Sequence, residues 1–468
     1  MASPADPSSF DRAFARLRAG AERVIETPCA FVFLAGERAW KLKRPVDFGF
    51  LDYSTIERRR WAAARELAFN RVTAPDVYLA VVEVGGEPVV EMRRFDEGAV
   101  LANRPEACDA ALAEALGRRI ARFHAEAPAT EEGGAGAIDY VLDSNAGVLR
   151  EGADALGAEA VEALIADSRA AFEQVAPLLE RRRASGLSRR CHGDLHLGNI
   201  FVENGAPVLF DCIEFNDALN RIDVLYDLAF LLMDLCFVGR GAAANRVLNG
   251  WLDEAARRLG EAAFSGLKAL PLLLSVRAAV RCHVSLKGGD PALARRYLAA
   301  ARSFLEPAAP AVLAVGGLSG SGKTTFARTR APELGPLPGA VLLRSDEIRK
   351  RLWNAGPLDP LPPQAYAPGE SGRVYGRMFE EAALALQAGR AVVLDAVFLR
   401  PDERDAAQAL ARERGVAFEG VWLDVPPEVM RARVEARAGD ASDADAAVLD
   451  EQLTRDPGEI RWTRRSSL

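Results

Sequence analysis

The chain has 468 residues, of which 49% are hydrophobic and 27% are charged, and its formal net charge is −7. This length exceeds one ordinary hydrophobic core, so we expect two or three folded domains rather than a disordered protein. The acidic balance excludes an overall basic surface and disfavours nucleic acid as a partner, although a local basic groove remains compatible with it.

The cysteines and the apolar runs bear on metal binding and location. The six cysteines form no C-x-x-C pair and the four histidines show no ligand spacing, so we expect no structural zinc site. Unpaired thiols are typical of a reducing compartment. The N-terminus lacks the pattern of a signal peptide, and Asp227 and Asp234 interrupt the apolar run 224–239. We therefore expect a buried helix there and a cytoplasmic protein without membrane contact.

The first hundred residues predict a small sheet with one long helix. Residues 30–45 form a strand pair around a turn at Ala35-Gly36, and residues 76–95 form a second hairpin that turns at Gly85-Gly86. Between the hairpins, residues 54–74 predict a helix.

This helix has Ser54 or Thr55 as its N-cap. Its apolar face is predicted to carry Trp61, Ala64, Leu67 and Ala68.

Most of the next two hundred residues predict helices, clearest at 109–125, 159–185 and 218–239. Two short apolar runs, N-I-F-V and P-V-L-F-D, lie between the last two helices. Further helices are predicted up to Phe304. The proline- and alanine-rich stretch 305–311 then predicts a linker, after which buried strands alternate with helices. The predicted domains are 1–305, with an N-lobe at about 20–100 and a helical C-lobe at about 101–305, then a linker at 306–311 and a second domain at 312–468.

The sequence H-G-D-L-H-L-G-N places Asp194 and Asn199 in one loop, and Asp211 follows an apolar strand a short distance later. Phosphoryl transfer needs a carboxylate that orients the incoming hydroxyl, and an amide and a carboxylate that hold Mg²⁺. We therefore predict Asp194 as the catalytic base and Asn199 and Asp211 as metal ligands. A turn without catalytic function is the alternative for the H-G-D sequence taken alone.

The same chemistry requires a lysine on an upstream strand that a helix glutamate holds in place. Lys41 and Lys43 share one face of a predicted strand, and Glu66 lies on the long helix. Ala39, two residues before Lys41, matches a small residue beneath an adenine, which favours Lys41. Lys43 stays open as the alternative.

These residues resemble the aminoglycoside phosphotransferase family, a branch of the protein-kinase-like fold, over about residues 31–227. The resemblance implies an α+β domain in which Lys41 and Glu66 position the nucleotide phosphates. The chain departs from protein kinases by lacking a G-x-G-x-x-G loop and by carrying Gly193 where they have an arginine. These changes favour the branch that acts on small molecules.

The region 218–304, predicted to bind the acceptor, has no dense acidic cluster. A polycationic aminoglycoside would prefer carboxylates, so a neutral or anionic metabolite is an equally good candidate. The basic residues of this region include Arg240, Arg277, Arg281 and Lys287.

A second phosphate-binding motif begins at Gly317, where G-L-S-G-S-G-K-T satisfies G-x-x-x-x-G-K-[ST] between an apolar strand and a helix. Its backbone N–H groups and the helix dipole favour phosphate binding. We expect Lys323 to reach the β- and γ-phosphates and act in catalysis, and Thr324 to bind Mg²⁺. The predicted nucleotide-binding residues are Gly317, Ser319, Gly320, Ser321, Gly322, Lys323, Thr324 and Thr325. A glycine-rich turn that happens to contain a lysine is the alternative.

Two acidic residues follow later strands of this region. The carboxyl ends of parallel strands line the ligand crevice of open α/β sheets. We therefore predict Asp346 as a general base on the substrate hydroxyl and Asp395 as a Mg²⁺ ligand. The alternatives are that Ser345 or Asp346 is a helix N-cap and that Asp395 only ends its strand.

Arginines complete this second set. Arg349 lies one helical turn after Asp346 as a candidate anion clamp. Arg431, Arg433 and Arg437 lie on a later helix, where a closing flap could bring Arg437 to the transferring phosphoryl group. A solvated helix face is the alternative for each of these three arginines.

Residues 310–468 resemble the small-molecule P-loop kinases, a grouping with gluconate kinase, polynucleotide 5′-kinase, chloramphenicol phosphotransferase and zeta toxins. The whole chain resembles a two-domain bacterial family that fuses an aminoglycoside-phosphotransferase-like domain to an AAA-type P-loop domain. This implies an α+β protein-kinase-like domain followed by an α/β P-loop domain with a parallel sheet.

We therefore predict a bifunctional phosphotransferase that uses ATP and Mg²⁺ on hydroxyl groups of small molecules, with one site in each domain. A 5′-hydroxyl kinase of nucleic acid in the C-terminal domain is one alternative. A regulatory nucleotide-binding role for one domain is the other. The sequence does not predict an oligomeric state.

Overall fold

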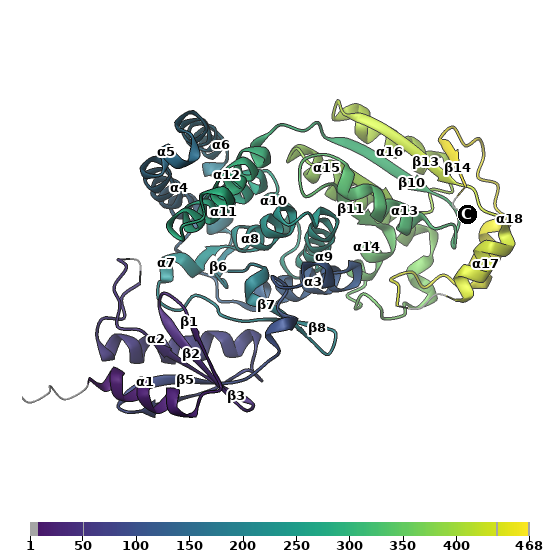
Figure 1. The fold of residues 1–468 in the computed structure, drawn as a ribbon. Helices are drawn as coiled ribbons and strands as arrows, with labels where there is room; N and C mark the ends of the chain where they lie inside the picture. The colour runs from purple at the N-terminus through teal and green to yellow at the C-terminus, as the bar shows by residue number, and fades with distance from the viewer. Residues whose placement is uncertain (1–7, 50, 437–438, 467–468) are drawn as a thin grey trace, which may run out of the picture.

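The computed structural model describes residues 8–49, 51–436 and 439–466. It has a small sheet at the N-terminal end, a helical middle and a second sheet with its helices at the C-terminal end (Figure 1). We call the first sheet and the helical middle the N-terminal domain, and the remainder the C-terminal domain. The predicted fold class is confirmed for both domains.

The first sheet is antiparallel, with the strand order β1-β2-β3-β5-β4. Both predicted hairpins are present, and Thr55 is the N-cap of the long helix α2. Helix α1 was not predicted; Phe10, Phe14 and Leu17 pack it against the sheet. The elements are α1 Ser9–Gly20, β1 Arg23–Glu26, β2 Ala30–Ala35, β3 Arg38–Lys43, α2 Ile56–Thr73, β4 Tyr78–Val84 and β5 Glu87–Arg93.

The face of α2 that was predicted to be apolar is not the face that packs on the sheet, so this prediction is wrong. Trp61 is 49% exposed, whereas the fully buried positions include Ala62, Ala63 and Glu66. The buried face carries charges because the sheet supplies their partners. For example, the Arg59 guanidinium binds both oxygens of Glu87, at 2.7 and 2.8 Å.

The middle of the chain is mostly helical around a core that includes α8. The predicted single helix 218–239 is instead a short helix, a strand and α8, because β9 pairs with β6 and Asp223 caps α8. The run 224–239 contributes a buried helix, as predicted. Among the described residues, no helix has both the length and the apolar character needed to cross a bilayer.

The elements of this middle part are as follows. The helices are α3 Ala110–Glu126, α4 Gly134–Glu151, α5 Ala153–Leu156, α6 Ala158–Ala184, α7 Asp217–Asn220, α8 Val224–Phe237, α9 Gly241–Leu259, α10 Ala262–Ser265, α11 Leu270–Lys287 and α12 Pro291–Leu305. The short strands pair as β6 Ser188–Arg190 with β9 Arg221–Asp223, and β7 Ile200–Glu203 with β8 Ala206–Leu209. Single 3₁₀ turns are η1 Glu97–Ala99, η2 Pro105–Ala107 and η3 Leu197–Asn199.

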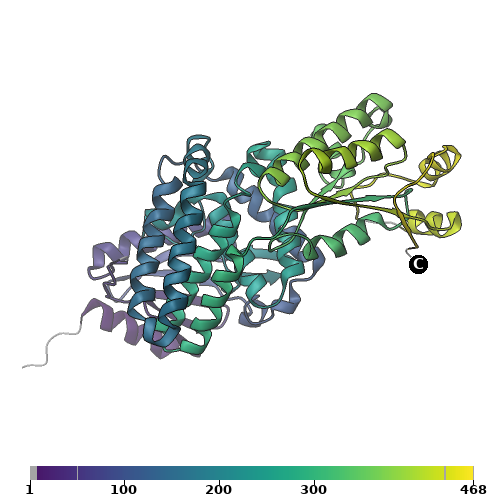
Figure 2. The ribbon, with the colours of Figure 1, turned by 90° about the horizontal axis from the view of Figure 1, so that it is seen from above.

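The C-terminal sheet is parallel throughout, with the strand order β11-β12-β10-β13-β14. Helices lie on both of its faces (Figure 2). Successive strand residues point to opposite faces, so Val312 and Ala314 lie in one core with residues of α15, while Leu313 and Val315 lie in another with Ala327 of α13.

The strands of this domain are β10 Ala311–Gly316, β11 Val341–Arg344, β12 Val392–Asp395, β13 Ala417–Leu423 and β14 Thr463–Arg465. Its helices are α13 Lys323–Arg330, α14 Ser345–Leu352, α15 Pro368–Gln387, α16 Pro401–Glu413, α17 Pro427–Glu435 and α18 Ala446–Thr454, with 3₁₀ turns η4 Ala331–Glu333 and η5 Pro363–Tyr366.

Helix α9 of the N-terminal domain covers the edge of this sheet at β11. The backbone N–H of Leu342 donates to Asn249 Oδ1 at 2.7 Å, and the Ala340 carbonyl oxygen accepts from Asn245 Nδ2 at 3.0 Å. An open strand edge exposes unpaired backbone groups that can template aggregation. The two asparagines therefore satisfy backbone groups that the sheet itself leaves without partners.

Replacing Asn249 by Ala leaves the partly buried Leu342 N–H without its acceptor, so we expect a loss of about 1–3 kcal/mol in the free energy of unfolding. Urea unfolding and amide hydrogen exchange at β11 measure this loss. Asn103→Ala is the control, since its side chain bonds the Glu97 carbonyl on the exposed surface. Equal effects of the two substitutions would contradict the role of Asn249.

Candidate active sites

The loop between β6 and β7 holds Asp194, and Asp227 of α8 fixes its backbone. The N–H groups of His192 and Gly193 donate to the two oxygens of Asp227, at 3.1 and 2.8 Å. His124 of α3 lies 3.0 Å from the same carboxylate. Gly193 has φ +84°, and a Cβ there would lie 2.8 Å from the Leu219 carbonyl oxygen. This crowding explains why the arginine of protein kinases has no counterpart here.

His124, Cys191 and Asp227 each bring one possible metal ligand atom within 4.8 Å of the others. Cys191 Sγ already lies 3.5 Å from the Ile222 carbonyl oxygen, and His124 Nδ1 accepts from Trp251 Nε1 at 3.0 Å. These contacts, with the bonds to Asp227, assign the cluster to holding the loop rather than to a zinc ion.

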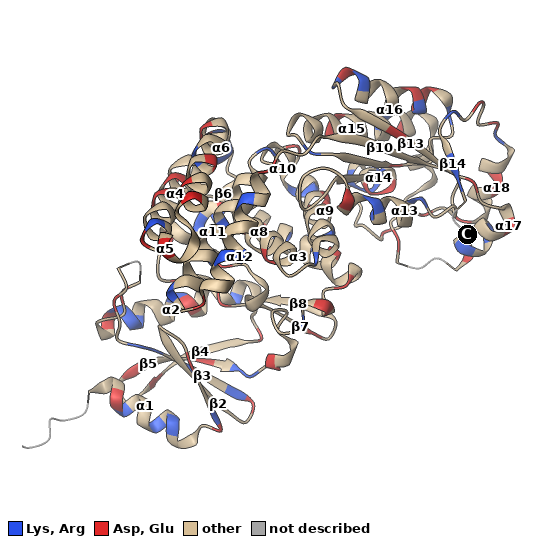
Figure 3. Ribbon diagram, turned by 45° about the horizontal axis from the view of Figure 1, so that its top comes forward, with Lys and Arg blue, Asp and Glu red and all other residues tan. Residues whose placement is uncertain are grey.

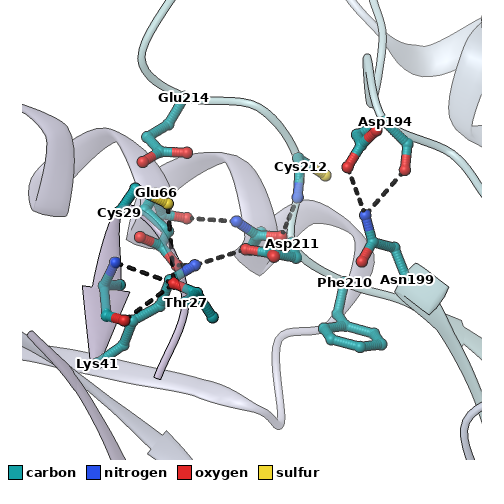
Figure 4. Close-up of polar contacts among 12 residues, drawn as sticks. Thr27, Cys29, Lys41, Glu66, Asp194, Asn199, Phe210, Asp211, Cys212 and Glu214 are labelled. Atoms are coloured by element: carbon teal, nitrogen blue, oxygen red, sulfur yellow. Dashed lines mark hydrogen bonds and ion pairs between the residues drawn. The ribbon is translucent and has the colours of Figure 1, made fainter. Parts of the chain in front are cut away.

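Asn199 joins Asp194 within the loop. Its Nδ2 donates to the Asp194 carbonyl oxygen at 2.9 Å and to Asp194 Oδ2 at 3.0 Å (Figure 4). His196 Nε2 lies 3.4 Å from the same Oδ2. Burial alone would raise the pKa of Asp194, but the charge and hydrogen bond of His196 lower it well below its usual range. Asp194 is therefore a carboxylate over the whole neutral range.

Asp211 lies beside this pair because β7 and β8 form a hairpin, in which the Phe210 N–H donates to the Asn199 carbonyl oxygen at 3.0 Å. Its backbone is left-handed, with φ +63°, and its N–H donates to the hydroxyl of Tyr78 at 3.2 Å. The hairpin thus brings together an amide and two carboxylates, which are the oxygen ligands that Mg²⁺ prefers.

The structure distinguishes the two candidate lysines. Lys41 Nζ lies between Glu66 Oε1, at 2.8 Å, and Asp211 Oδ1, at 2.6 Å (Figure 4). Lys43 is 2% exposed and binds Glu66 Oε2 at 2.7 Å, the carboxylate of Glu214 and, at 3.2 Å, the hydroxyl of Tyr53. Lys41 therefore reaches Asp211, whereas Lys43 is enclosed on the far side of Glu66.

Glu214 and Tyr53 are site residues that the sequence reasoning missed. Burial alone would lower the pKa of Lys43, but the carboxylates of Glu214 and Glu66 raise it. The sequence does indicate a second carboxylate, because two lysines on one buried strand face need more than one carboxylate as partners. Glu214 lies three residues after Asp211 and was a natural candidate.

The phosphate-binding loop joins β10 to α13. Lys323, the first residue of α13, donates to the Leu318 carbonyl oxygen at 2.9 Å, and Thr324 Oγ1 donates to Asp395 Oδ2 at 2.7 Å. Asp395 ends β12, and β10 pairs with β12 in parallel. The two oxygen ligands proposed for Mg²⁺ therefore lie in direct contact at the carboxyl edge of the sheet.

Two further residues contact this loop and were not predicted. Gln452 of α18 accepts from the Ser319 N–H at 2.8 Å. Arg344, the last residue of β11, has its Nε 3.4 Å from Asp395 Oδ2 and its Nη2 3.4 Å from Thr324 Oγ1. Burial raises the pKa of Asp395, although the Arg344 and Lys323 charges oppose the rise.

Asp346 and Arg349 lie on α14, which follows β11 directly. The helix has Arg344 as its N-cap, so the alternative in which Ser345 or Asp346 takes that position is wrong. Asp346 is partly buried in the first turn. Arg349 is buried, and its Nη1 donates to the Ala365 carbonyl oxygen at 2.6 Å.

Of the flap arginines, Arg431 pairs with Asp450 of α18, with Nη1 3.1 Å from Oδ2. Arg437 lies outside the described residues.

Comparisons with known proteins give a separate family match for each of the two parts of the chain. Residues 52–262 match the model of a phosphotransferase enzyme family, and residues 312–456 match the model of an AAA domain. Uncharacterized proteins of Mycobacterium bovis and Mycobacterium tuberculosis are 34% identical over 450 residues, which cover 91% of this chain and 88% of theirs. The chain belongs to the same family as these mycobacterial proteins, and the resemblances predicted for its two parts are confirmed.

Solved structures similar to parts of the chain include a Plasmodium vivax ethanolamine kinase, at 11% identity and a TM-score of 0.40. The match covers 61% of this chain and 82% of the kinase chain. A choline/ethanolamine kinase family protein of Mesorhizobium loti has 17% identity and a TM-score of 0.38, covering 64% and 95%. A gluconokinase of Sinorhizobium meliloti has 23% identity and a TM-score of 0.24, covering 34% and 82%.

The contact between His196 and Asp194 predicts a pH effect. Burial alone would lower the pKa of His196, but the Asp194 carboxylate raises it above its ordinary value of about 6.5. The protonated form therefore stabilises the folded state below about pH 6.5, and this stabilisation is lost as the pH rises through the folded pKa. NMR titration of the imidazole should show the raised pKa in the native chain and a lower one in Asp194→Asn.

His283 is the internal control for this titration. Burial, with a smaller effect of Lys287, lowers its pKa to about 4, and this value should be the same in both proteins. A His196 pKa at or below 6.5 in the native chain would contradict the prediction.

Proposed function

We propose that the chain is a bifunctional phosphotransferase that uses ATP and Mg²⁺, with one active site in each domain and a hydroxyl group of a small molecule as each acceptor. The observation that carries this proposal is that each domain assembles its own set of phosphate- and metal-binding groups. Lys41, Glu66 and Asp211 are in contact in one domain, and Thr324 and Asp395 in the other. We place the boundary at residues 306–311, which run from the end of α12 to the first residue of β10.

In the N-terminal site, Asp194, whose lowered pKa keeps it ionised at neutral pH, orients the acceptor hydroxyl and accepts its proton as the phosphoryl group is transferred. Asn199 and Asp211 hold Mg²⁺, and Lys41, oriented by Glu66, holds the nucleotide phosphates. When bound, ATP would supply the transferred phosphoryl group and Mg²⁺ would neutralise part of its charge. Lys43 keeps Glu66 ionised and in place from the buried side of the strand.

In the C-terminal site, the backbone N–H groups of the loop and the side chain of Lys323 bind phosphate, and Thr324 and Asp395 hold Mg²⁺. The loop residues assigned to nucleotide binding are Gly317, Ser319, Gly320, Ser321, Gly322, Lys323, Thr324 and Thr325. Asp346 is the base for the second acceptor.

The acceptor of the N-terminal site is neutral or anionic in this proposal. Arg277 of α11 is buried and stacks on Tyr226 at 3.8 Å, and its charge contributes to the lowered pKa of Asp194. Arg281, one turn later, has its Nε 3.4 Å from the hydroxyl of Tyr297. Positive charge beside the catalytic base disfavours a polycationic acceptor such as an aminoglycoside.

Charge of both signs is interspersed over the two domains in Figure 3, which supports small molecules rather than nucleic acid as acceptors.

Loss of each site should remove a different product. Asp194→Ala should lower phosphorylation by the N-terminal site by a factor of about 10² to 10⁴, because the general base is lost. Lys323→Ala should abolish a second product that Asp194→Ala leaves unchanged. Mass spectrometry of a metabolite pool incubated with ATP and each protein measures both, with a 5′-hydroxyl oligonucleotide included as a competing acceptor.

Unchanged products in both variants would exclude the bifunctional assignment. A phosphorylated oligonucleotide that disappears in Lys323→Ala would instead identify a nucleic-acid kinase. An Asp194 variant with unchanged products but an altered response to ATP would identify a regulatory domain.

The two lysines should separate activity from stability. Lys41→Met should remove activity at the N-terminal site with little change in stability, since Glu66 keeps Lys43 as its partner. Lys43→Met should cost about 3–5 kcal/mol of stability because it leaves Glu214 buried without its cation. Product formation and urea unfolding of the two variants test this, and the reverse pattern would make Lys43 the phosphate-binding lysine.

A further inference from the structure

Arg118 of α3 crosses from the N-terminal domain to the C-terminal domain. Its side chain is buried, with Nη2 3.2 Å from Glu347 Oε1 on α14. Its Nη1 contacts the Asp253 carboxylate on α9. The guanidinium therefore joins a carboxylate of its own domain to one of the other.

Glu347 in turn contacts Arg344, the residue that lies against Thr324 and Asp395. The same Oε1 accepts from Arg344 Nη1 at 3.0 Å. Arg344 is 3% exposed and also donates to Asp440 Oδ1 at 2.7 Å. Arg344 in turn touches Thr324 and Asp395, as described above, so a continuous buried chain of charged groups runs from α9 to the proposed metal ligands.

The balance of charge in this chain depends on Arg118. Arg344 forms ion pairs with three carboxylates, those of Glu347, Asp395 and Asp440. Its shortest contact is with Asp440, and its contacts with Asp395 and Thr324 are the longest. Without Arg118, Arg344 would be the one cation in direct contact with Glu347 among the described residues, and buried charges need partners. The guanidinium would then be drawn toward Glu347 and away from Asp395.

The position of Arg118 is fixed by the packing of its helix. A Cβ at Gly117 would lie 2.2 Å from the Val247 carbonyl oxygen of α9, and one at Gly250 would lie 2.7 Å from the Glu114 carbonyl oxygen of α3. The two helices are therefore in close backbone contact. Helix α9 is also bonded to the β11 region, through Asn245 to the Ala340 carbonyl oxygen and through Asn249 to the Leu342 N–H. Arg118 is therefore held at a set distance from α14.

We propose that Arg118 is a positioning residue for the P-loop site: through Glu347 it sets the orientation of Arg344, which in turn orients Asp395 and Thr324 for Mg²⁺. The P-loop site is thus completed by a side chain of the other domain. This inference rests on the proposed function of the C-terminal domain. Outer-shell partners of metal ligands typically change metal affinity by about 10- to 100-fold when they are removed.

The test compares Arg118→Gln with Arg122→Gln in the full-length chain. Arg122 is one turn along the same helix, is 45% exposed at its side chain and pairs with Glu254 at 3.3 Å, so it matches Arg118 without reaching α14. All proteins carry Asp211→Ala, which removes a proposed metal ligand of the N-terminal site. Mn²⁺ affinity is measured by electron paramagnetic resonance with a non-hydrolysable ATP analogue.

We expect Arg118→Gln to weaken Mn²⁺ binding by about tenfold or more, and Arg122→Gln to leave it unchanged. The Mg²⁺ concentration needed for half-maximal P-loop turnover should rise in parallel in Arg118→Gln. Equal Mn²⁺ affinity in the two arginine variants would overturn the inference.

Glu347→Gln, which is nearly isosteric, decides the matter if Arg118→Gln does not fold. It removes the carboxylate through which Arg118 acts on Arg344, so a changed Mn²⁺ affinity supports the inference and an unchanged affinity overturns it. Asp395→Asn and Lys323→Ala test the proposed function separately. If neither alters binding of the metal or the nucleotide, the P-loop assignment itself fails, whatever the result at Arg118.

Discussion

The close contact between α3 and α9 is the constraint on which both candidate sites depend. Glycine at positions 117 and 250 lets the two backbones approach to a distance that any Cβ would prevent. On one side of this pair, His124 and Trp251 support Asp227, which holds the loop that carries Asp194. On the other side, α9 covers β11. A shift between these two helices would therefore disturb the geometry of both domains.

Charged groups in both sites already have protein partners in the described structure. Lys41 contacts Asp211, Lys323 donates to a carbonyl oxygen of its own loop, and Thr324 donates to Asp395. Binding of the proposed Mg²⁺ and nucleotide would therefore exchange these contacts for new ones. Unpaired buried charge is costly, so this arrangement keeps the polar groups oriented without destabilising the fold.

The sequence predicted those parts of the sites that depend on local structure. Asn199 and Asp211 flank one hairpin, and Lys323 and Thr324 follow one strand, so short-range patterns were sufficient. Arg344, Gln452 and Glu214 were missed because their partners lie far away in the chain. The face of α2 was predicted wrongly for a related reason: Glu66 is buried because two strand lysines meet it, and an amphipathic pattern has no means of representing such pairs.

The cover that α9 gives to β11 also bears on how the chain folds during synthesis. Residues 241–259 leave the ribosome before residues 341–344, so the asparagines of α9 can be in place when the edge strand emerges. The backbone groups at β11 would then find the asparagine side chains of α9 as soon as the strand emerges, instead of staying exposed. A rearranged gene that placed the C-terminal domain first would reverse this order and expose the edge to other nascent chains. We therefore expect the order of the two domains to protect the edge strand during synthesis.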